Sequence, residues 1–225
     1  MFFKQFYDNN LSQASYLVGC QRTGEAIIID PVRDLTKYME VADSEGFTIT
    51  QAAETHIHAD FASGIRDVAE QLNANVYVSG EGDDELSYRN MPEQTHFVKH
   101  QDIIHVGNIK LEVLHTPGHT PESISFLLTD EGGGSSVPMG LFSGDFVFVG
   151  DIGRPDLLEK SVQMEGSTEV SAKQMYQSIE SVKDLPDYIQ IWPGHGAGSP
   201  CGKALGAVPM STLGYEKINN WAFNV

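Results

Sequence analysis

Two kinds of hydrophobic spacing alternate along the chain. Runs of apolar and β-branched residues, bounded by turn-forming residues, indicate strands at residues 14–19, 26–29, 48–53, 76–78, 102–106, 109–114, 124–128, 139–143 and 188–192. Apolar residues at every third or fourth position indicate helices at residues 34–42, 65–72 and 171–182. We expect Asp34 to cap the first helix and Gly46 to end it. This succession predicts two packed sheets with helices on the outside.

The pattern gives no reason to divide the chain into domains. Its 225 residues suit one large layered core. Residues 131–138 hold three consecutive glycines and two serines, so we interpret them as a mobile surface loop and not as a linker. A single domain over residues 1–225 is therefore predicted.

Charge and cysteine content narrow the classes of function. A net charge of −17 and a pI near 4.6 argue against nucleic acid as a partner, because phosphate binding needs clustered Lys and Arg. No apolar run is long enough to span a membrane and no secretory signal is visible, so we expect a cytoplasmic protein without a membrane partner. Cys20 and Cys201 are the only cysteines, which argues against a disulfide framework. We interpret Cys20 as structural.

Potential metal ligands directly follow four of the predicted strands. They lie in tight turns that contain His56, His58 and Asp60, then His119, then Asp145, and finally His195. Each turn alone is typical of an ordinary surface loop, but strand ends commonly form ligand sites, so the four turns could converge on one rim. Imidazole and carboxylate groups in such turns suit a transition-metal ion. The residue after Asp60 is Phe61, which cannot bind a metal.

The motifs His56-Ile-His58-Ala-Asp60, Pro117-Gly-His119-Thr, Gly144-Asp145 and Pro193-Gly-His195 resemble those of the metallo-β-lactamase superfamily in order and spacing. The resemblance covers nearly the whole chain. It implies an α+β fold, the four-layer αβ/βα sandwich, with metal at the edge of the two sheets. Because the superfamily includes lactamases, thioesterases, nucleases and dioxygenases, the fold alone does not choose the reaction.

A narrower resemblance is carried by the segments Glu54–Phe61, Gly150–Leu157 and Pro193–Lys203. They are similar to the dioxygenase domain of bacterial persulfide dioxygenase and rhodanese fusion proteins. The chain would then be a stand-alone relative or the N-terminal part of a longer fusion. The resemblance implies one Fe(2+) per chain with three protein ligands, namely His56, His119 and Asp145. It leaves His58, Asp60 and His195 as residues that orient these ligands or replace them.

Two further residues acquire candidate roles from the same resemblance. Cys201 would be a catalytic thiol close to the iron that handles sulfur, whereas its alternative is a buried, inert side chain. Arg154 would bind the carboxylate or phosphate of the thiol that carries the persulfide. The alternative for Arg154 is a structural ion pair with Asp151 or Asp156.

Three functional hypotheses remain open on the sequence. The first is an iron-dependent persulfide dioxygenase that oxidises a persulfide of glutathione, coenzyme A or a similar thiol with O2 to sulfite and thiol, in sulfide detoxification. The second is a glyoxalase II-like thioester hydrolase with two metals, against which Phe61 argues because it replaces a ligand of the second metal. The third is a non-catalytic sulfur-relay module. We expect a homo-oligomer and, as a possible partner in cis or in trans, a rhodanese-type sulfurtransferase.

Overall fold

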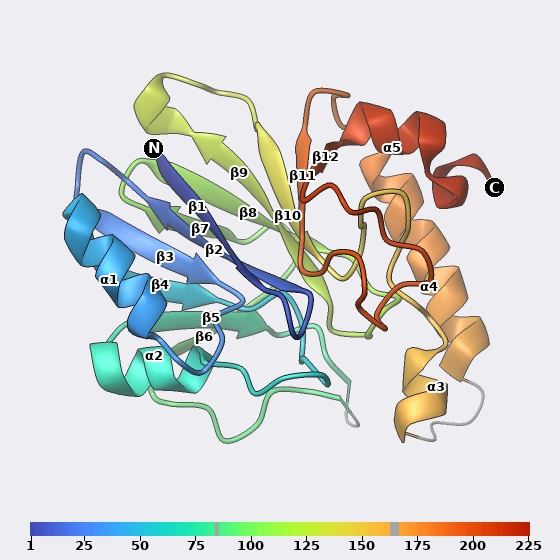
Figure 1. The fold of residues 1–225 in the computed structure, drawn as a ribbon, viewed down its shortest axis with the longest axis horizontal. Coiled ribbons are helices and arrows are strands. Elements are labelled where there is room, and N and C mark those ends of the chain that lie inside the picture. The colour runs from blue at the N-terminus through green and yellow to red at the C-terminus, as the bar shows by residue number, and fades with distance from the viewer. Residues whose placement is uncertain (84–85, 163–166) are drawn as a thin grey trace.

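The computed structural model describes residues 1–83, 86–162 and 167–225. Two six-stranded sheets pack face to face, with helices on the outer face of each sheet (Figure 1). This is the α+β sandwich that the succession of strands and helices predicts. None of the helices in these ranges combines the length and apolar character needed to cross a membrane.

The first sheet has the strand order β1-β2-β3-β4-β5-β6. Its strands are β1 (Phe2–Asp8), β2 (Gln13–Gly19), β3 (Glu25–Ile29), β4 (Thr48–Ala53), β5 (Asn75–Ser79) and β6 (Thr95–Val98). β2 and β3 pair antiparallel as neighbours, as the sequence indicates, and β3 to β6 run parallel. The carboxyl end of β4 therefore opens onto the turn that carries the first histidines.

The second sheet has the order β12-β11-β10-β9-β8-β7. Its strands are β7 (Ile103–Val106), β8 (Ile109–His115), β9 (Ile124–Asp130), β10 (Gly140–Gly144), β11 (Gln190–Pro193) and β12 (Ser211–Thr212). Only β10 and β11 run parallel within this sheet, and Gly144 lies opposite Pro193. This register places the turns that follow the two strands side by side.

The helices lie on the outer faces of the two sheets (Figure 1). They are α1 (Thr36–Glu45), α2 (Ile65–Leu72), α3 (Leu157–Val162), α4 (Ser167–Val182) and α5 (Leu213–Asn219), with short 3-10 turns η1 (Glu131–Gly133) and η2 (Trp221–Asn224). Gly46 ends α1 in the left-handed conformation, as predicted. The prediction for Asp34 is wrong, because Leu35 is the N-cap. Asp34 instead accepts a hydrogen bond from the Thr36 N–H at 3.1 Å, in a turn that precedes the helix.

Alternation along the strands divides the core into three apolar layers. Ile27 and Ile29 point between the sheets, where they meet residues of the second sheet such as Phe126. Ile28 points the opposite way, toward α1 and α2. The third layer, which includes Ile179, packs the second sheet against α4 and the C-terminal helices. Side chains of successive strand residues face opposite sides, so one strand serves two layers.

Several local features differ from the sequence prediction. The helices α3 and α5 were not predicted. The strands β6 and β12 were not predicted either, because β6 exposes much of its surface, including Phe97, and β12 has only two residues. The predicted loop 131–138 begins with the short turn η1. α4 begins four residues before the predicted helix, at Ser167. None of these differences changes the layer order.

Candidate metal centre

Three buried side chains from three different strand ends converge at the edge of the sandwich. His56 follows β4, His119 follows β8 and Asp145 follows β10. Each offers one ligand atom, and these atoms lie within 4.8 Å of one another. The structure thus brings together the three residues that the sequence analysis selected as iron ligands.

The orientation of Asp145 fits a cation. Its Oδ2 lies 3.7 Å from His56 Nε2 and 3.4 Å from His119 Nε2. This oxygen is buried and has no hydrogen-bond partner among the described residues. Buried carboxylate oxygens are normally satisfied, so an oxygen without a partner that faces two imidazole nitrogens suits a metal ion. Two histidines and one carboxylate form a donor set typical of non-heme Fe(II) sites.

Glycines allow the ligand turns to approach their surroundings closely. Gly144 has a φ of 52°, and a Cβ there would lie 2.5 Å from Thr55 Oγ1. Gly118 has a φ of 141°, and a Cβ there would lie 2.5 Å from Met175 Cβ. Any other residue at these positions would move Asp145 or His119, the ligands that follow them.

Hydrogen bonds from the neighbouring loop orient His56. Thr55 donates its backbone N–H to Asp30 Oδ1 at 2.7 Å and its hydroxyl to Asp30 Oδ2 at 2.9 Å. Because that hydroxyl proton goes to Asp30, Thr55 Oγ1 accepts the Nδ1–H of His56 at 3.0 Å. His56 Nε2 therefore keeps its lone pair toward the centre. These roles of Asp30 and Thr55 were not predicted from the sequence. The available signal was the position of Asp30, a carboxylate that directly follows β3.

The protonation states also suit metal binding. Burial lowers the pKa of His56 well below its usual value, and burial likewise lowers the pKa of His119. Both rings are therefore neutral, as metal ligands must be. Burial opposes ionisation of Asp145, but the positive charge of the nearby His195 outweighs it and holds the pKa of Asp145 well below its usual range.

His195 makes two hydrogen bonds to carboxylates and does not join this cluster. Its Nδ1 donates to Asp145 Oδ1 at 2.7 Å, and its Nε2 donates to Asp60 Oδ2 at 2.8 Å. Burial would lower the pKa of His195, but Asp145 and Asp60 together raise it to about 10. The ring is an imidazolium that links two carboxylates.

His58 packs beside His56, with ring centroids 4.2 Å apart, but it is not one of the three converging residues. Its Nε2 is 3.3 Å from Asp30 Oδ1 and 3.9 Å from Glu54 Oε1. Its ring centroid lies 4.3 Å from that of Phe61, in a tilted arrangement. Burial would lower the pKa of His58, but the nearby carboxylate of Asp30 raises it to about 9. His58 thus fits a role beside the ligands better than a role among them.

Cys201 reaches the edge of this centre. Its sulfur belongs to a second group with Asp60 and His195, in which one potential ligand atom per residue lies within 4.8 Å of the others. Burial raises the pKa of the Cys201 thiol, and the negative charge of Asp145 raises it further. The thiol is therefore both buried and close to the candidate ligands.

Arg154 makes the structural ion pair that the sequence suggested as its alternative role, and the partner is Asp156. Arg154 Nε and Nη2 donate to the two carboxylate oxygens of Asp156 at 3.0 Å and 2.9 Å. About one fifth of the Arg154 side chain, 21%, remains exposed. The guanidinium is therefore fixed in direction while part of it stays open to an anion.

Comparison with known proteins identifies the family. A model of the metallo-beta-lactamase superfamily matches residues 8–195. The chain therefore belongs to this superfamily, whose members share the fold described above. The match includes all four ligand-bearing turns.

Three relatives illustrate the range within this family. The crystal structure of a metallo-beta-lactamase from Staphylococcus aureus subsp. aureus COL is 76% identical with a TM-score of 0.94, and the match covers 100% of this chain and 63% of that one. ETHE1 from Myxococcus xanthus is 30% identical with a TM-score of 0.77, over 98% of this chain and 83% of that one. A hydroxyacylglutathione hydrolase from Polaromonas sp. (strain JS666 / ATCC BAA-500) is 31% identical over 80% of this chain and 61% of its own length. The chain thus spans less than two thirds of the first and third of these relatives.

Proposed function

We propose that this chain is a non-heme Fe(II) persulfide dioxygenase that holds one iron per chain. It converts the persulfide of a low-molecular-weight thiol, O2 and water into the thiol and sulfite, and so serves sulfide detoxification. The structural likeness to ETHE1, a persulfide dioxygenase, supports this branch of the superfamily.

The double hydrogen bonding of His195 carries the proposal. Both ring nitrogens are occupied by carboxylates, so His195 has no lone pair to offer a second metal while this arrangement persists. Phe61 stands where related di-metal hydrolases have another histidine ligand. The imidazolium lies between Asp60 and Asp145 and balances the charge of both carboxylates. The hydrogen bonds of His195 and the presence of Phe61 therefore favour a single metal ion, held by His56, His119 and Asp145.

Two of the three ligands are oriented by separate hydrogen bonds. Thr55 fixes the ring of His56, and His195 fixes the carboxylate of Asp145 by holding Oδ1 so that Oδ2 faces the two imidazoles. When bound, a ferrous ion supplies the redox chemistry with O2 and open positions for the substrate sulfur. The protein residues bind the ion, orient its ligands and keep the site enclosed.

Arg154 and Cys201 would handle the substrate beside the metal. The exposed part of the Arg154 guanidinium suits the carboxylate of glutathione or the phosphate of coenzyme A. Cys201, next to Asp60 and His195, stands where a sulfur atom of the persulfide could be received. A rhodanese-type sulfurtransferase, in cis or in trans, would be a suitable partner for such sulfur chemistry.

A glyoxalase II-like thioester hydrolase is the second candidate. The similarity to the Polaromonas hydroxyacylglutathione hydrolase favours it, as does the second group of potential ligands formed by Asp60, His195 and Cys201. For this group to bind a metal through His195 Nε2, the hydrogen bond from that nitrogen to Asp60 would have to break, while the Nδ1 bond to Asp145 could remain. The cost of losing this charge-assisted hydrogen bond makes the hydrolase the weaker candidate.

Turnover with two classes of substrate, persulfides and a thioester, distinguishes the candidates. Anaerobically purified, iron-loaded protein is mixed with glutathione persulfide, with coenzyme A persulfide and, separately, with a glutathione thioester. The proposal predicts oxygen uptake and sulfite formation with at least one persulfide and no thioester hydrolysis above background. Thioester hydrolysis without oxygen uptake would replace it with the hydrolase.

A further inference from the structure

The carboxylate of Asp151, outside the ligand cluster, is buried and satisfied by three separate donors. Its Oδ2 accepts the backbone N–H groups of Lys203 and Ala204 at 2.6 Å and 2.7 Å, and its Oδ1 accepts the indole N–H of Trp221 at 3.1 Å. Only 1% of Asp151 is exposed. Hydrogen bonds to a charged acceptor are stronger than neutral ones, so Asp151 is a firm anchor for the chain that follows Cys201.

The segment 199–204, which we call the thiol loop, contains little regular structure of its own. Ser199 Oγ accepts the Cys201 N–H at 3.1 Å, and Cys201 O accepts the backbone N–H of Arg154 at 2.9 Å. A Cβ at Gly202 would lie 3.1 Å from Asp151 Oδ2, so the loop passes directly over the carboxylate. Asp151 thus holds the side of the loop after Cys201, while Arg154 holds Cys201 itself.

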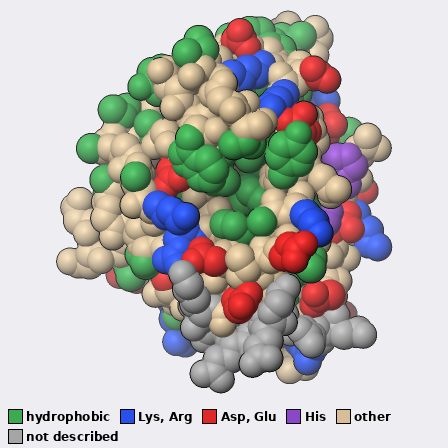
Figure 2. All heavy atoms as spheres, turned by 90° about the vertical axis from the view of Figure 1, so that its right-hand side faces the viewer, with side chains coloured by type: hydrophobic (Ala, Val, Ile, Leu, Met, Phe, Trp, Pro, Cys, Tyr) green, Lys and Arg blue, Asp and Glu red, His purple; other side chains and the backbone are tan. Residues whose placement is uncertain are grey.

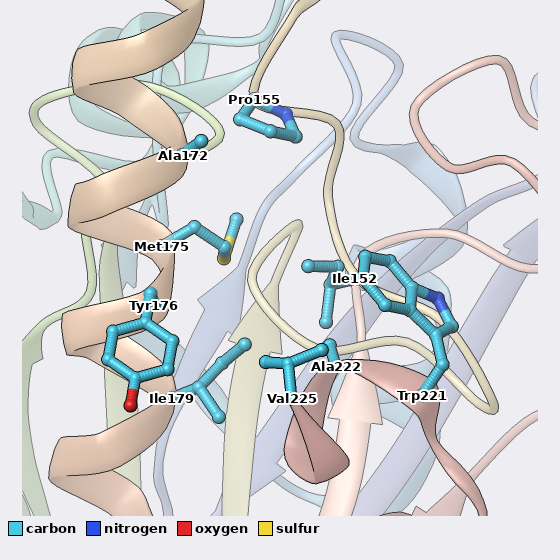
Figure 3. Close-up of a pocket in the computed structure, with 9 residues that line it drawn as sticks. All are labelled: Ile152, Pro155, Ala172, Met175, Tyr176, Ile179, Trp221, Ala222 and Val225. Carbon is cyan, nitrogen blue, oxygen red and sulfur yellow. The ribbon is translucent and has the colours of Figure 1, made fainter.

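The same carboxylate ties the thiol loop to the C-terminal segment. Trp221 and Ile152 line a hollow of about 160 Å³ between η2 and α4 (Figure 3). Figure 2 shows hydrophobic side chains gathered on this side of the molecule, with charged side chains around them. Asn220, at the C-terminal end of α5, donates from Nδ2 to the backbone oxygen of Asp151 at 2.9 Å and to Glu216 Oε2 at 2.8 Å. The end of α5 therefore holds the backbone of Asp151 in place.

We propose that Asp151 is the positioning residue that holds the Cys201 thiol beside Asp60 and His195. Without its carboxylate, the N–H groups of Lys203 and Ala204 would lose their acceptor and the thiol loop would open to water. Asp151 touches neither the ligand cluster nor the thiol, so its action passes through the backbone of the loop. The inference rests on the proposed function only in giving Cys201 a role in sulfur transfer.

The two cysteines offer a direct test, because both are buried and only Cys201 lies on the thiol loop. Each has 3% of its surface exposed, and Cys20 lies away from the loop, where its sulfur accepts the Asn108 N–H. Alkylation by iodoacetamide is followed at each cysteine by mass spectrometry in wild-type protein and in Asp151→Ala. We expect Asp151→Ala to raise the alkylation rate of Cys201 roughly tenfold and that of Cys20 by less than about twofold, because only the local opening becomes easier.

Trp221→Phe is the matched control. It removes the indole donor to Asp151 but keeps an aromatic ring in the hollow and leaves both loop hydrogen bonds intact. Both cysteines should then react within about twofold of the wild-type rates, since the loop keeps its acceptor. An equal rise at both cysteines in Asp151→Ala, or no rise at Cys201, would overturn the proposal.

A second variant covers the case in which Asp151→Ala does not fold. Ala204→Pro removes one N–H donor to Asp151 and leaves the carboxylate in place, so the alkylation rate of Cys201 should again rise more than that of Cys20. An unchanged Cys201 rate in this variant would equally contradict the inference. Alkylation requires neither metal nor turnover, so the result does not depend on the dioxygenase reaction. With active protein, Asp151→Ala should also lower kcat for the persulfide while iron content stays at the wild-type level.

Discussion

His195 Nδ1 lies 2.7 Å from Asp145 Oδ1 and thereby leaves the second oxygen of that carboxylate directed at two imidazoles. This contact joins the turn after β11 to the turn after β10, two strands that run parallel and adjacent. A histidine that resembles a metal ligand in sequence therefore orients a candidate ligand in the structure. This difference bears on whether the site holds one metal ion or two.

Replacement of His195 tests this orienting role. In His195→Asn, Asp145 loses its charged partner, and we expect the affinity for Fe(2+) to fall about 10- to 100-fold, the usual cost of losing a residue that orients a metal ligand. Competition with a chelator measures the affinity. His105→Asn, at an exposed position on β7, should bind iron as the wild type does. Unchanged affinity in His195→Asn would contradict the role.

The proposed single-metal site depends in part on Phe61, so a ligand introduced at this position should have a measurable effect. Phe61→His adds an imidazole near Asp60. We expect this variant to bind more than one and at most two metal ions per chain, provided that His195 gives up its hydrogen bonds to the carboxylates. Metal content per chain after equilibration with excess Zn(2+) or Fe(2+) is the measurement. Phe61→Leu, which has no ligand atom, is the control and should remain at the wild-type content. A wild-type protein that already binds two ions would remove the basis of this prediction.

Arg154 is expected to act on substrate binding more than on the chemical step. Arg154→Gln should raise KM for the persulfide about tenfold with a smaller change in kcat, because it removes a charge that pairs with the anionic carrier. The exposed Arg33→Gln is the control for the loss of one positive charge. Equal kinetics in wild type and Arg154→Gln would show that Arg154 has only its ion pair with Asp156.

The layer between the sheets should dominate stability. Phe142 is 1% exposed and packs against Phe3, Tyr16 and Trp192, with ring centroids between 4.7 and 6.1 Å away. Phe142→Ala should lower the free energy of unfolding by about 3–5 kcal/mol, the usual cost of truncating a buried Phe. Val170→Ala, at a position that is 58% exposed, should change it by less than about 0.5 kcal/mol. Denaturant unfolding of the metal-free proteins provides both values.

The sequence predicted which turns meet at the edge of the sandwich, because each turn directly follows a predicted strand and contains a Pro, Gly or polar residue. It also predicted the layering, because strand and helix spacing differ. It could not predict that Gly144 lies opposite Pro193, since register depends on pairing between segments far apart in the chain. For that reason the hydrogen bonds of His195 were not predictable from sequence.

The partners of Asp151 and Arg154 depended on loop conformation in the same way. The sequence offered Arg154 two acidic neighbours, Asp151 and Asp156, at nearly equal distance along the chain. In the structure Asp156 takes the guanidinium, whereas Asp151 turns inward to the thiol loop and Trp221. The choice follows from the path of the chain after β10, which no local pattern encodes.

Iron content and oxygen consumption, measured together in wild type and His119→Ala, test the central claim most directly. Protein purified without oxygen is analysed for metals and then mixed with a thiol persulfide in an oxygen electrode. We predict about one iron per chain and one O2 consumed per sulfite in the wild type, and loss of both iron and oxygen uptake in His119→Ala, because three protein ligands hold the ion. Two metal ions per wild-type chain, or iron-loaded protein that consumes no oxygen, would contradict the account.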